Sequence, residues 1–187
     1  MEEIKLSDDV FEQIKDFVHY DLTEEQNLLI DKLILNEELK ERYKKYGLCE
    51  ECKQPNTGNS GKNSSYTWCQ PCNAKRFQQN LQNWTSGNHD IDEFIQKTQL
   101  RAKNSSKFIE WVEYDRFENV EYLAKGGFGT TYKAIWKDGY ILSWNSENNQ
   151  WERFKKDEEG HPVALKCLHN SQDITAEFLR EVGSFSF

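Results

Sequence analysis

Four of the five cysteines form two short motifs whose spacing suits metal binding. The sequence reads CEEC at residues 49–52 and CQPC at residues 69–72, with sixteen residues between the inner cysteines. Each C-x2-C turn brings two thiolates within reach of one ion, and two turns supply the four sulfur ligands of a tetrahedral zinc site. Because no ligand position is left for water, the pattern predicts a structural rather than a catalytic zinc ion, held by Cys49, Cys52, Cys69 and Cys72.

The alternatives for these cysteines are a redox-active pair and reduced thiols that only pack. A redox pair needs a βαβ context of the thioredoxin type, which the flanking sequence does not show. The remaining cysteine, Cys167, lies in an apolar run. Because free cysteine is often buried, Cys167 is predicted to be a small core residue.

A glycine-rich stretch, LAKGGFGTTYKAIW at residues 123–136, offers a second kind of chemistry. Glycines allow backbone amides to approach phosphate oxygens closely. The protein-kinase pattern G-x-G-x-x-G-x-V finds glycine at two of its three glycine positions, Gly126 and Gly129. Ala124 occupies the first glycine position, and Thr131 occupies the valine position. An ordinary glycine-rich hairpin would have a similar sequence, so this stretch alone is weak evidence for a phosphate site.

The sequence after this stretch favours phosphate binding over an ordinary hairpin. VALK at residues 163–166 is an apolar strand that ends in a lone lysine, and ITAEFLREV at residues 174–182 is an amphipathic helix. A strand lysine on the α/β-phosphates, held by a helix glutamate, is the arrangement of a kinase small lobe. We expect Lys166 to be this lysine and Glu181 its partner, with Glu177, one helical turn earlier, as the alternative.

Residues 108–183 resemble the N-terminal lobe of a eukaryotic protein kinase, up to and including its αC helix. The whole chain resembles an expanded kinase family of arbuscular mycorrhizal fungi through YGLCEEC, WCQPC, QNWTSGN and IEWVEYDRFENVEYLAKGGFGTTYKAIW, in this order. The resemblance implies that Leu123 and Ala164 line an adenine pocket and that Lys166 pairs with the phosphates. The implied cofactor is ATP, with Mg²⁺ in a complete kinase, and the implied nucleotide-binding residues are Leu123, Ala124, Lys125, Gly126, Gly127, Phe128, Gly129, Thr130, Thr131, Ala164, Lys166 and Glu181.

Two departures from the kinase pattern bear on ATP affinity. A methyl group at Ala124 is tolerated only where the backbone φ is negative. Thr131 replaces an apolar contact to adenine with a hydroxyl, so we expect weaker binding of ATP.

The kinase motifs H-R-D and D-F-G do not occur in the 187 residues. These motifs supply the catalytic Asp and the Mg²⁺-binding Asp. The sequence therefore predicts a truncated protein kinase for Ser/Thr, with Tyr as an alternative acceptor, present as an ATP-binding small lobe that is inactive by itself. The alternatives are a non-enzymatic zinc-ribbon interaction protein and a decoy that occupies the partners of full-length relatives.

The predicted fold class is α+β, with a mostly antiparallel sheet. Strands are expected across residues 120–136 and 161–168, and one αC helix is expected at the end of the chain. A domain boundary is predicted near residues 104–110, where helical periodicity gives way to short aromatic strands. The chain is thus predicted to have four regions: a helical N-terminal segment (1–46), a four-cysteine zinc-ribbon-like module (47–73), a helical connector (74–107) and a partial protein kinase domain (108–187).

Local signals place further elements inside these regions. Thr23 and Gln26 have the spacing of a capping box, and residues 5–46 are predicted to form a helical hairpin. Helices are also expected over residues 74–84 and 90–103. Between the second and third strands of the lobe, two aromatic runs flank NSENN and predict an extra β-hairpin that packs on the lobe, with a partner surface as the alternative. These runs are residues 140–144 and 150–154.

Composition limits the partners and the compartment. The net charge is −8, which argues against general affinity for nucleic acid or anionic membranes. The acidic, amphipathic start is not a signal peptide, and no stretch has the roughly 18 consecutive apolar residues of a membrane span. We therefore expect a cytoplasmic or nuclear protein that binds ATP and an unknown protein substrate.

Overall fold

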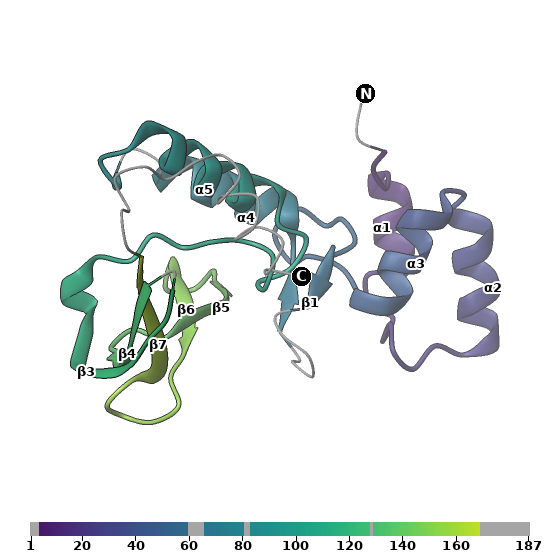
Figure 1. Ribbon diagram of the computed structural model, residues 1–187. Helices are drawn as coiled ribbons and strands as arrows, with labels where there is room; N and C mark the ends of the chain where they lie inside the picture. The colour runs from purple at the N-terminus through teal and green to yellow at the C-terminus, as the bar shows by residue number, and fades with distance from the viewer. Residues whose placement is uncertain (1–3, 60–65, 81–82, 128, 169–187) are drawn as a thin grey trace.

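The computed structural model describes residues 4–59, 66–80, 83–127 and 129–168. Over these residues the fold combines five α-helices with short and long antiparallel strands (Figure 1). The predicted mixture of helices and antiparallel sheet is thus confirmed. The predicted αC helix, with Glu177 and Glu181, lies outside the described residues, as does Phe128.

The N-terminal region contains three helices rather than the predicted hairpin of two helical runs. They are α1 (Asp8–Ile14), α2 (Glu24–Leu33) and α3 (Glu37–Tyr46). The chain turns extended at Ile34, and the side chain of Asn36 accepts a hydrogen bond from the Leu39 amide. Because this cap starts a new helix, the periodic run divides into α2 and α3.

The predicted capping box at Thr23 is confirmed. The Thr23 hydroxyl accepts from the Gln26 amide, and the Gln26 side chain accepts from the Thr23 amide. Apolar faces of the three helices meet in one cluster of buried residues, formed by Leu6, Ile14, Ile30, Ile34, Leu39 and Tyr43. This cluster is the first of two hydrophobic cores.

Two further helices come after the cysteine-bearing segment. Strands β1 (Gly58–Asn59) and β2 (Thr67–Trp68) pair, and then α4 (Gln70–Asn80) and α5 (His89–Arg101) lie side by side. Helix α4 begins four residues before the predicted start, because Pro71 suits the first helical turn and the helix includes Cys72. Helix α5 matches the prediction closely, and Asn88 caps it.

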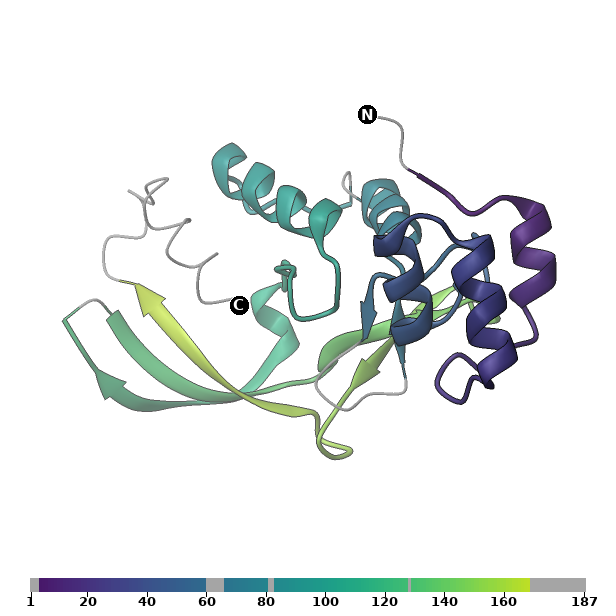
Figure 2. The same cartoon turned by 90° about the vertical axis from the view of Figure 1, so that its right-hand side faces the viewer.

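The predicted strands of the C-terminal half are present. After a short 3-10 turn at Tyr114–Arg116, β3 (Phe117–Lys125), β4 (Gly129–Trp136) and β7 (His161–Leu168) form an antiparallel sheet in that order (Figure 2). The strands β5 (Tyr140–Asn145) and β6 (Gln150–Phe154) form the predicted hairpin around NSENN. This hairpin is a separate two-stranded sheet.

The β5–β6 hairpin does not pack where the sequence placed it. Ile141 and Trp151 join a second core with Trp68 and Phe77, so the hairpin lies mainly against the cysteine-bearing region rather than on the three-stranded sheet. Aromatic alternation gives the exposed and buried faces of a hairpin, but it does not say which surface the buried face meets. This core, with Phe108, contains residues from both sides of the predicted domain boundary.

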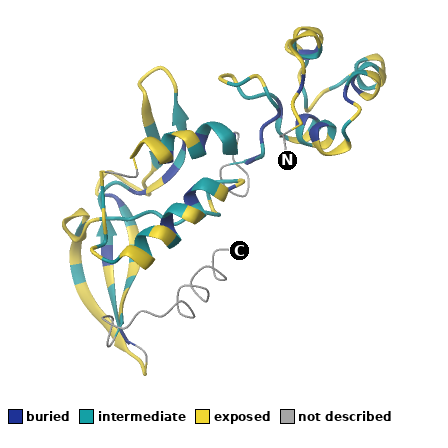
Figure 3. Cartoon of the chain, turned by 90° about the horizontal axis from the view of Figure 1, so that it is seen from above, coloured by how far each residue is buried: buried dark blue, intermediate teal, exposed yellow. Residues whose placement is uncertain are grey.

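The three-stranded sheet exposes much of its surface (Figure 3). Tyr122 and Leu123 on β3 are 64% and 57% exposed. Cys167 on β7 is exposed, so the prediction of a buried core residue was wrong. The apolar run around Cys167 is typical of a buried strand, but only the earlier residues on its face of β7, Val163 and Leu165, are partly buried, whereas Cys167 near the strand end is exposed.

Candidate functional site

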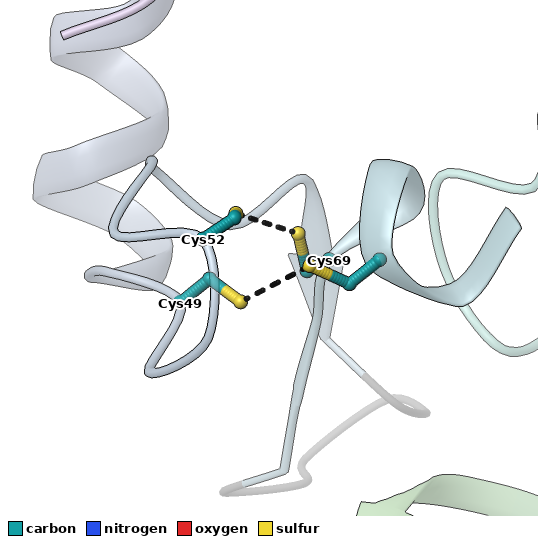
Figure 4. Close-up of side chains that lie close together, drawn as sticks. Cys49, Cys52 and Cys69 are labelled. Carbon is teal, nitrogen blue, oxygen red and sulfur yellow. Dashed lines mark hydrogen bonds between the residues drawn. The ribbon is translucent and has the colours of Figure 1, made fainter. Parts of the chain in front are cut away.

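The four cysteines of the two motifs converge at one point. Figure 4 shows Cys49, Cys52 and Cys69 with their sulfur atoms close together. The four sulfur atoms all lie within 4.8 Å of one another, with 3.8 Å between Cys49 and Cys72 and 3.5 Å between Cys52 and Cys69. Four thiolates placed tetrahedrally about 2.3 Å from one ion are separated by about 3.8 Å. The sulfurs therefore have the spacing that one tetrahedral metal ion requires, and the cluster could hold such an ion.

A tight turn shapes the first motif. The Lys53 amide donates to the Cys49 carbonyl at 2.9 Å, and the Cys49 amide donates to the Gln54 carbonyl at 2.8 Å. Lys53 closes the turn with φ of 61°, in the left-handed region. The Gln54 side chain then accepts from the Leu6 amide at 2.7 Å and donates to the Leu6 carbonyl. The first motif is thereby fixed to the N-terminal helical cluster.

The second motif is fixed to the other hydrophobic core. Trp68, directly before Cys69, is fully buried, and its Nε1 donates to the Ala102 carbonyl at 2.8 Å. Cys72 lies in the first turn of α4, whose Phe77 packs on Trp68. The cluster thus joins two cores that the chain builds separately.

An arginine missed in the sequence analysis connects both motifs. Arg76 forms an ion pair with Glu51 in the first motif and donates to the Asn73 side chain at 2.6 Å. Its guanidinium lies 4.5 Å from the centre of the Trp144 ring on the hairpin. The one sequence signal for this role was spacing: Arg76 is four residues after Cys72, so the two side chains lie on the same face of the helix.

The electrostatics of the thiols favour binding of a cation. A hydrogen bond with Cys52 is the main cause that lowers the pKa of Cys49. Contact with Cys49 is in turn the main cause that raises the pKa of Cys69 and Cys72. Four thiolates this close repel one another, so the fully ionised cluster needs a positive ion, and binding that ion releases protons.

Of the predicted nucleotide-binding residues, eight of those described lie on the three-stranded sheet, and Gly126 and Gly127 lie in the connection between β3 and β4, while Phe128 and Glu181 lie outside the described residues. Ala124, Thr131 and Lys166 are directly opposite one another on β3, β4 and β7. Directly paired residues of antiparallel strands share one face, so these three side chains form one row. Lys125, Thr130 and Cys167 form the next row, on the other face. Ala164 and Lys166 are both exposed and share a face of β7.

The glycines between β3 and β4 have different roles. The Gly126 amide donates to the Gly129 carbonyl at 2.8 Å and closes the connection. A Cβ atom at Gly129 would lie 2.4 Å from the Cys167 carbonyl oxygen, so β7 itself requires glycine there. A Cβ at Gly127 would have no atom within 4 Å. A Cβ at Gly126 would lie 3.8 Å from the Gly129 carbonyl oxygen, which is an ordinary van der Waals distance. Packing therefore does not explain glycine at these two positions.

The backbone at Ala124 agrees with the requirement stated from the sequence. Ala124 is not among the described residues with positive φ, so its methyl group causes no strain. Leu123, implied for the adenine pocket, is 57% exposed. The exposed positions of Leu123, Ala164 and Lys166 leave the sheet accessible to a ligand.

A cleft of about 620 Å³ lies beside the cysteine cluster. Its lining comes from the N-terminal helices, both cysteine motifs and the hairpin, and includes Lys15, His19, Tyr66, Arg76 and Trp144. Burial lowers the pKa of His19, and the Nδ1 atom of this residue is buried without a hydrogen-bond partner. The cleft has the volume of a small-molecule or peptide site.

The chain matches no protein-family model, no curated protein and no solved structure among those compared. Among the described residues, no helix has the length and apolar character needed to cross a membrane.

Proposed function

We propose that the cysteine cluster is a structural zinc site. All four candidate ligands are sulfur atoms, and their mutual distances fit the tetrahedral geometry of Zn²⁺. When bound, zinc supplies free energy of folding rather than catalysis, because the four protein ligands complete its coordination. Elemental analysis of the purified chain should find one equivalent of zinc, and a Cys49→Ser/Cys52→Ser variant should lose it. Less than half an equivalent in the unchanged chain would contradict the assignment.

We further propose that β3, β4 and β7 form the nucleotide-binding half of a protein kinase small lobe. The observation that carries this proposal is the row of Ala124, Thr131 and Lys166 beside two glycines whose absent side chains leave open space. A backbone that approaches phosphate oxygens closely needs such space, and a strand lysine supplies the positive charge. The sequence resemblance to kinase small lobes supports the same assignment.

Each residue has a role in this proposal. The Lys166 ammonium group pairs with the α- and β-phosphates, and amides of Gly126 to Gly129 cover them. Leu123 and Ala164 contact the adenine ring, and Glu181, which lies outside the described residues, is the expected partner of Lys166. Kinases enclose adenine between two lobes, so a single lobe buries about half of it. Loss of roughly 100 Å² of apolar contact costs about 2.5 kcal/mol, or nearly two decades in affinity.

Phosphoryl transfer requires more than this sheet provides. A catalytic Asp must orient the acceptor hydroxyl, and a second Asp must hold Mg²⁺. The motifs that carry them, H-R-D and D-F-G, are absent from the 187 residues. We therefore expect this chain to bind ATP weakly and to transfer no phosphate, with protein Ser/Thr as the acceptor class only when the large lobe is present.

Binding of labelled ATP to the zinc-loaded chain tests the proposal. Lys166→Met should weaken binding at least tenfold, because the phosphates lose their cation. Lys97→Met, on the exposed surface of α5, is the matched control and should leave affinity unchanged. Equal affinity in both variants would contradict the nucleotide site. Phosphate transfer by the 187 residues that depends on Lys166 would contradict the expected inactivity.

A second candidate function is a non-enzymatic interaction module, including a decoy of full-length relatives. The cleft beside the cysteine cluster is the observation that favours it, since several segments converge there around aromatic and charged side chains. The ATP experiment separates the two functions, because the Lys166→Met substitution should not change the partner binding of an interaction module. Its own test is whether a Trp144→Ala variant that keeps its zinc loses a binding partner of the unchanged chain.

A further inference from the structure

The β5–β6 hairpin is attached to the rest of the protein in an unusual way. It lies between β4 and β7 in the sequence but makes its own two-stranded sheet. Backbone pairing with the three-stranded sheet therefore does not fix its position. Its side chains must do so, and they contact two different parts of the molecule.

One part is the second cysteine motif. Trp151 stacks on Trp68 with ring centres 6.0 Å apart and on Phe77 at 4.9 Å, with ring planes within 20°. Trp68 directly precedes Cys69, and Phe77 lies on α4, which includes Cys72. Ile141 on the opposite strand is only 3% exposed in the same core. The hairpin is thus packed on the element that carries two of the four thiols.

Contact with the first cysteine motif runs through Arg76. This side chain is only 12% exposed, and it pairs with Glu51 while its guanidinium covers the Trp144 ring. Glu51 lies between Cys49 and Cys52. Metal bound to all four thiols would hold both motifs at a fixed separation. The hairpin itself packs on Trp68, Phe77 and Arg76, on the side of the second motif. The first motif reaches the hairpin through Glu51, whose ion pair orients Arg76, and the metal would hold that pair in place.

The other part that the hairpin contacts is the start of β7. The rings of Tyr140 and Phe154, at the base of the hairpin, lie 5.1 Å and 5.7 Å from the His161 ring. Arg153 donates to the Gly139 carbonyl at 2.8 Å and pairs with Glu110. The two ring contacts join the base of the hairpin to the start of β7, and the Arg153 contacts fix the base against Gly139 and Glu110. The same strand carries Lys166 five residues later.

We propose that metal binding at the cysteine cluster controls the order of β7 through the β5–β6 hairpin. The aromatic stack and Arg76 hold one end of the hairpin on the metal-bound motifs, and the other end braces the strand that carries Lys166. Loss of the metal frees the two motifs, releases the hairpin and loosens β7. The structural coupling rests on the proposed zinc site, and its consequence for ATP affinity rests in addition on the proposed nucleotide site.

Amide hydrogen exchange of the full chain, without nucleotide, tests the coupling directly. Removing zinc with a chelator should speed exchange of β5, β6 and β7 amides at least tenfold, while β3 amides that pair with β4 change much less. Unchanged β7 exchange in the metal-free chain would overturn the proposal. An equal rise in β3 would indicate general unfolding and would overturn it as well.

A pair of matched double variants tests the route. Trp144→Leu/Trp151→Leu keeps all four cysteines but removes the ring contacts, so β7 should exchange fast even with zinc bound. Trp84→Leu/Trp111→Leu removes another stacked pair, with ring centres 6.3 Å apart, outside the route and should leave β7 exchange unchanged. Slow β7 exchange in the first variant would overturn the route.

The last experiment compares the ATP affinity of the chain with and without zinc. We expect at least fivefold weaker binding after zinc removal. If the unchanged zinc-loaded chain does not bind ATP, the proposed nucleotide site fails while the exchange result still decides the coupling. ATP affinity that is unaffected by zinc, in a chain that binds ATP, would overturn the functional consequence.

Discussion

The cysteine-bearing region and the three-stranded sheet are built on opposite principles. Around the cysteine cluster, packing of side chains holds the elements together. Trp68 is fully buried, and rings from α4 and the hairpin stack around it. In the sheet, backbone hydrogen bonds between strands hold the elements together, and side chains such as Tyr122, which is 64% exposed, are packed much less. The first region borders a cleft between packed elements, whereas the second presents an exposed face with glycine and lysine.

This difference assigns different roles to the two regions: the first holds neighbouring elements in place, and the second is open to a ligand. A region that is fixed by aromatic packing, and under the proposed function by a metal ion, can hold its neighbours in place, because displacing it breaks many contacts at once. A sheet with exposed faces can accept a ligand, because little has to move. The comparison indicates where each kind of perturbation should act.

The largest expected effect is loss of the metal. A Cys69→Ser/Cys72→Ser variant should unfold the cysteine-bearing region, because structural zinc supplies on the order of 10 kcal/mol of apparent folding free energy. Circular dichroism and tryptophan fluorescence with and without zinc measure this loss. Cys167→Ser is the control and should change neither signal, since Cys167 is exposed and distant from the cluster in sequence. Full structure in the metal-free chain would contradict the central role of the metal.

Aromatic residues in the two regions should differ next. Trp68→Ala should cost about 3–5 kcal/mol of unfolding free energy, because a fully buried ring and its hydrogen bond to Ala102 are lost. Tyr122→Ala, on the exposed sheet face, should cost less than about 1 kcal/mol. Denaturant titration of the zinc-loaded variants measures both values. Similar losses would show that the sheet is as well packed as the cysteine-bearing region.

Two glycines of the sheet should respond differently to the same substitution. Gly129→Ala places a methyl group about where a Cβ lies 2.4 Å from the Cys167 carbonyl oxygen, and the resulting overpacking should cost about 1–3 kcal/mol. Gly127→Ala meets no atom within 4 Å and should change stability by less than about 0.5 kcal/mol. Under the proposed function, Gly127→Ala should still weaken ATP binding. Retained ATP affinity in a stable Gly127→Ala chain would argue against close approach of the phosphates.

The smallest effects concern two ion pairs with opposite dependence on pH. A hydrogen bond from Arg116 lowers the pKa of Asp138 below its ordinary value of 3.8. Its contribution to stability is therefore present above pH 3.8 and is lost as the pH falls through the lowered pKa. Burial raises the pKa of Glu110 above 4.5 despite its pairing with Arg153. Its contribution is present below pH 4.5 and is lost as the pH rises through the raised pKa.

Variants of these two carboxylates separate the contributions. Asp138→Asn should remove the loss on the acid side, and Glu110→Gln should remove the loss above pH 4.5. The measurement is the difference in unfolding free energy between each variant and the unchanged chain at each pH, which cancels protonation of the thiols. Differences with the same pH slope for both variants would contradict the opposite shifts in pKa.

The sequence by itself determined the local features of this protein. Cysteine spacing predicted a cluster that the structure brings together, because a C-x2-C turn is set by a few neighbouring residues. Thr23 with Gln26 predicted a helix start, and the aromatic runs around NSENN predicted a hairpin, since caps and tight turns depend on short stretches of chain. The strands next to Gly126 and through Lys166 were predicted for the same reason.

Only the tertiary structure decided which surfaces meet. The sequence placed the β5–β6 hairpin on the sheet and Cys167 in a core, but Trp151 packs on Trp68 and Cys167 is exposed. The requirement for glycine at Gly129 likewise comes from β7, which arrives from almost forty residues away. Alternation of apolar and polar residues along a strand shows which face is buried, but not which segment packs against that face. Burial depends on contacts between segments that are distant in sequence.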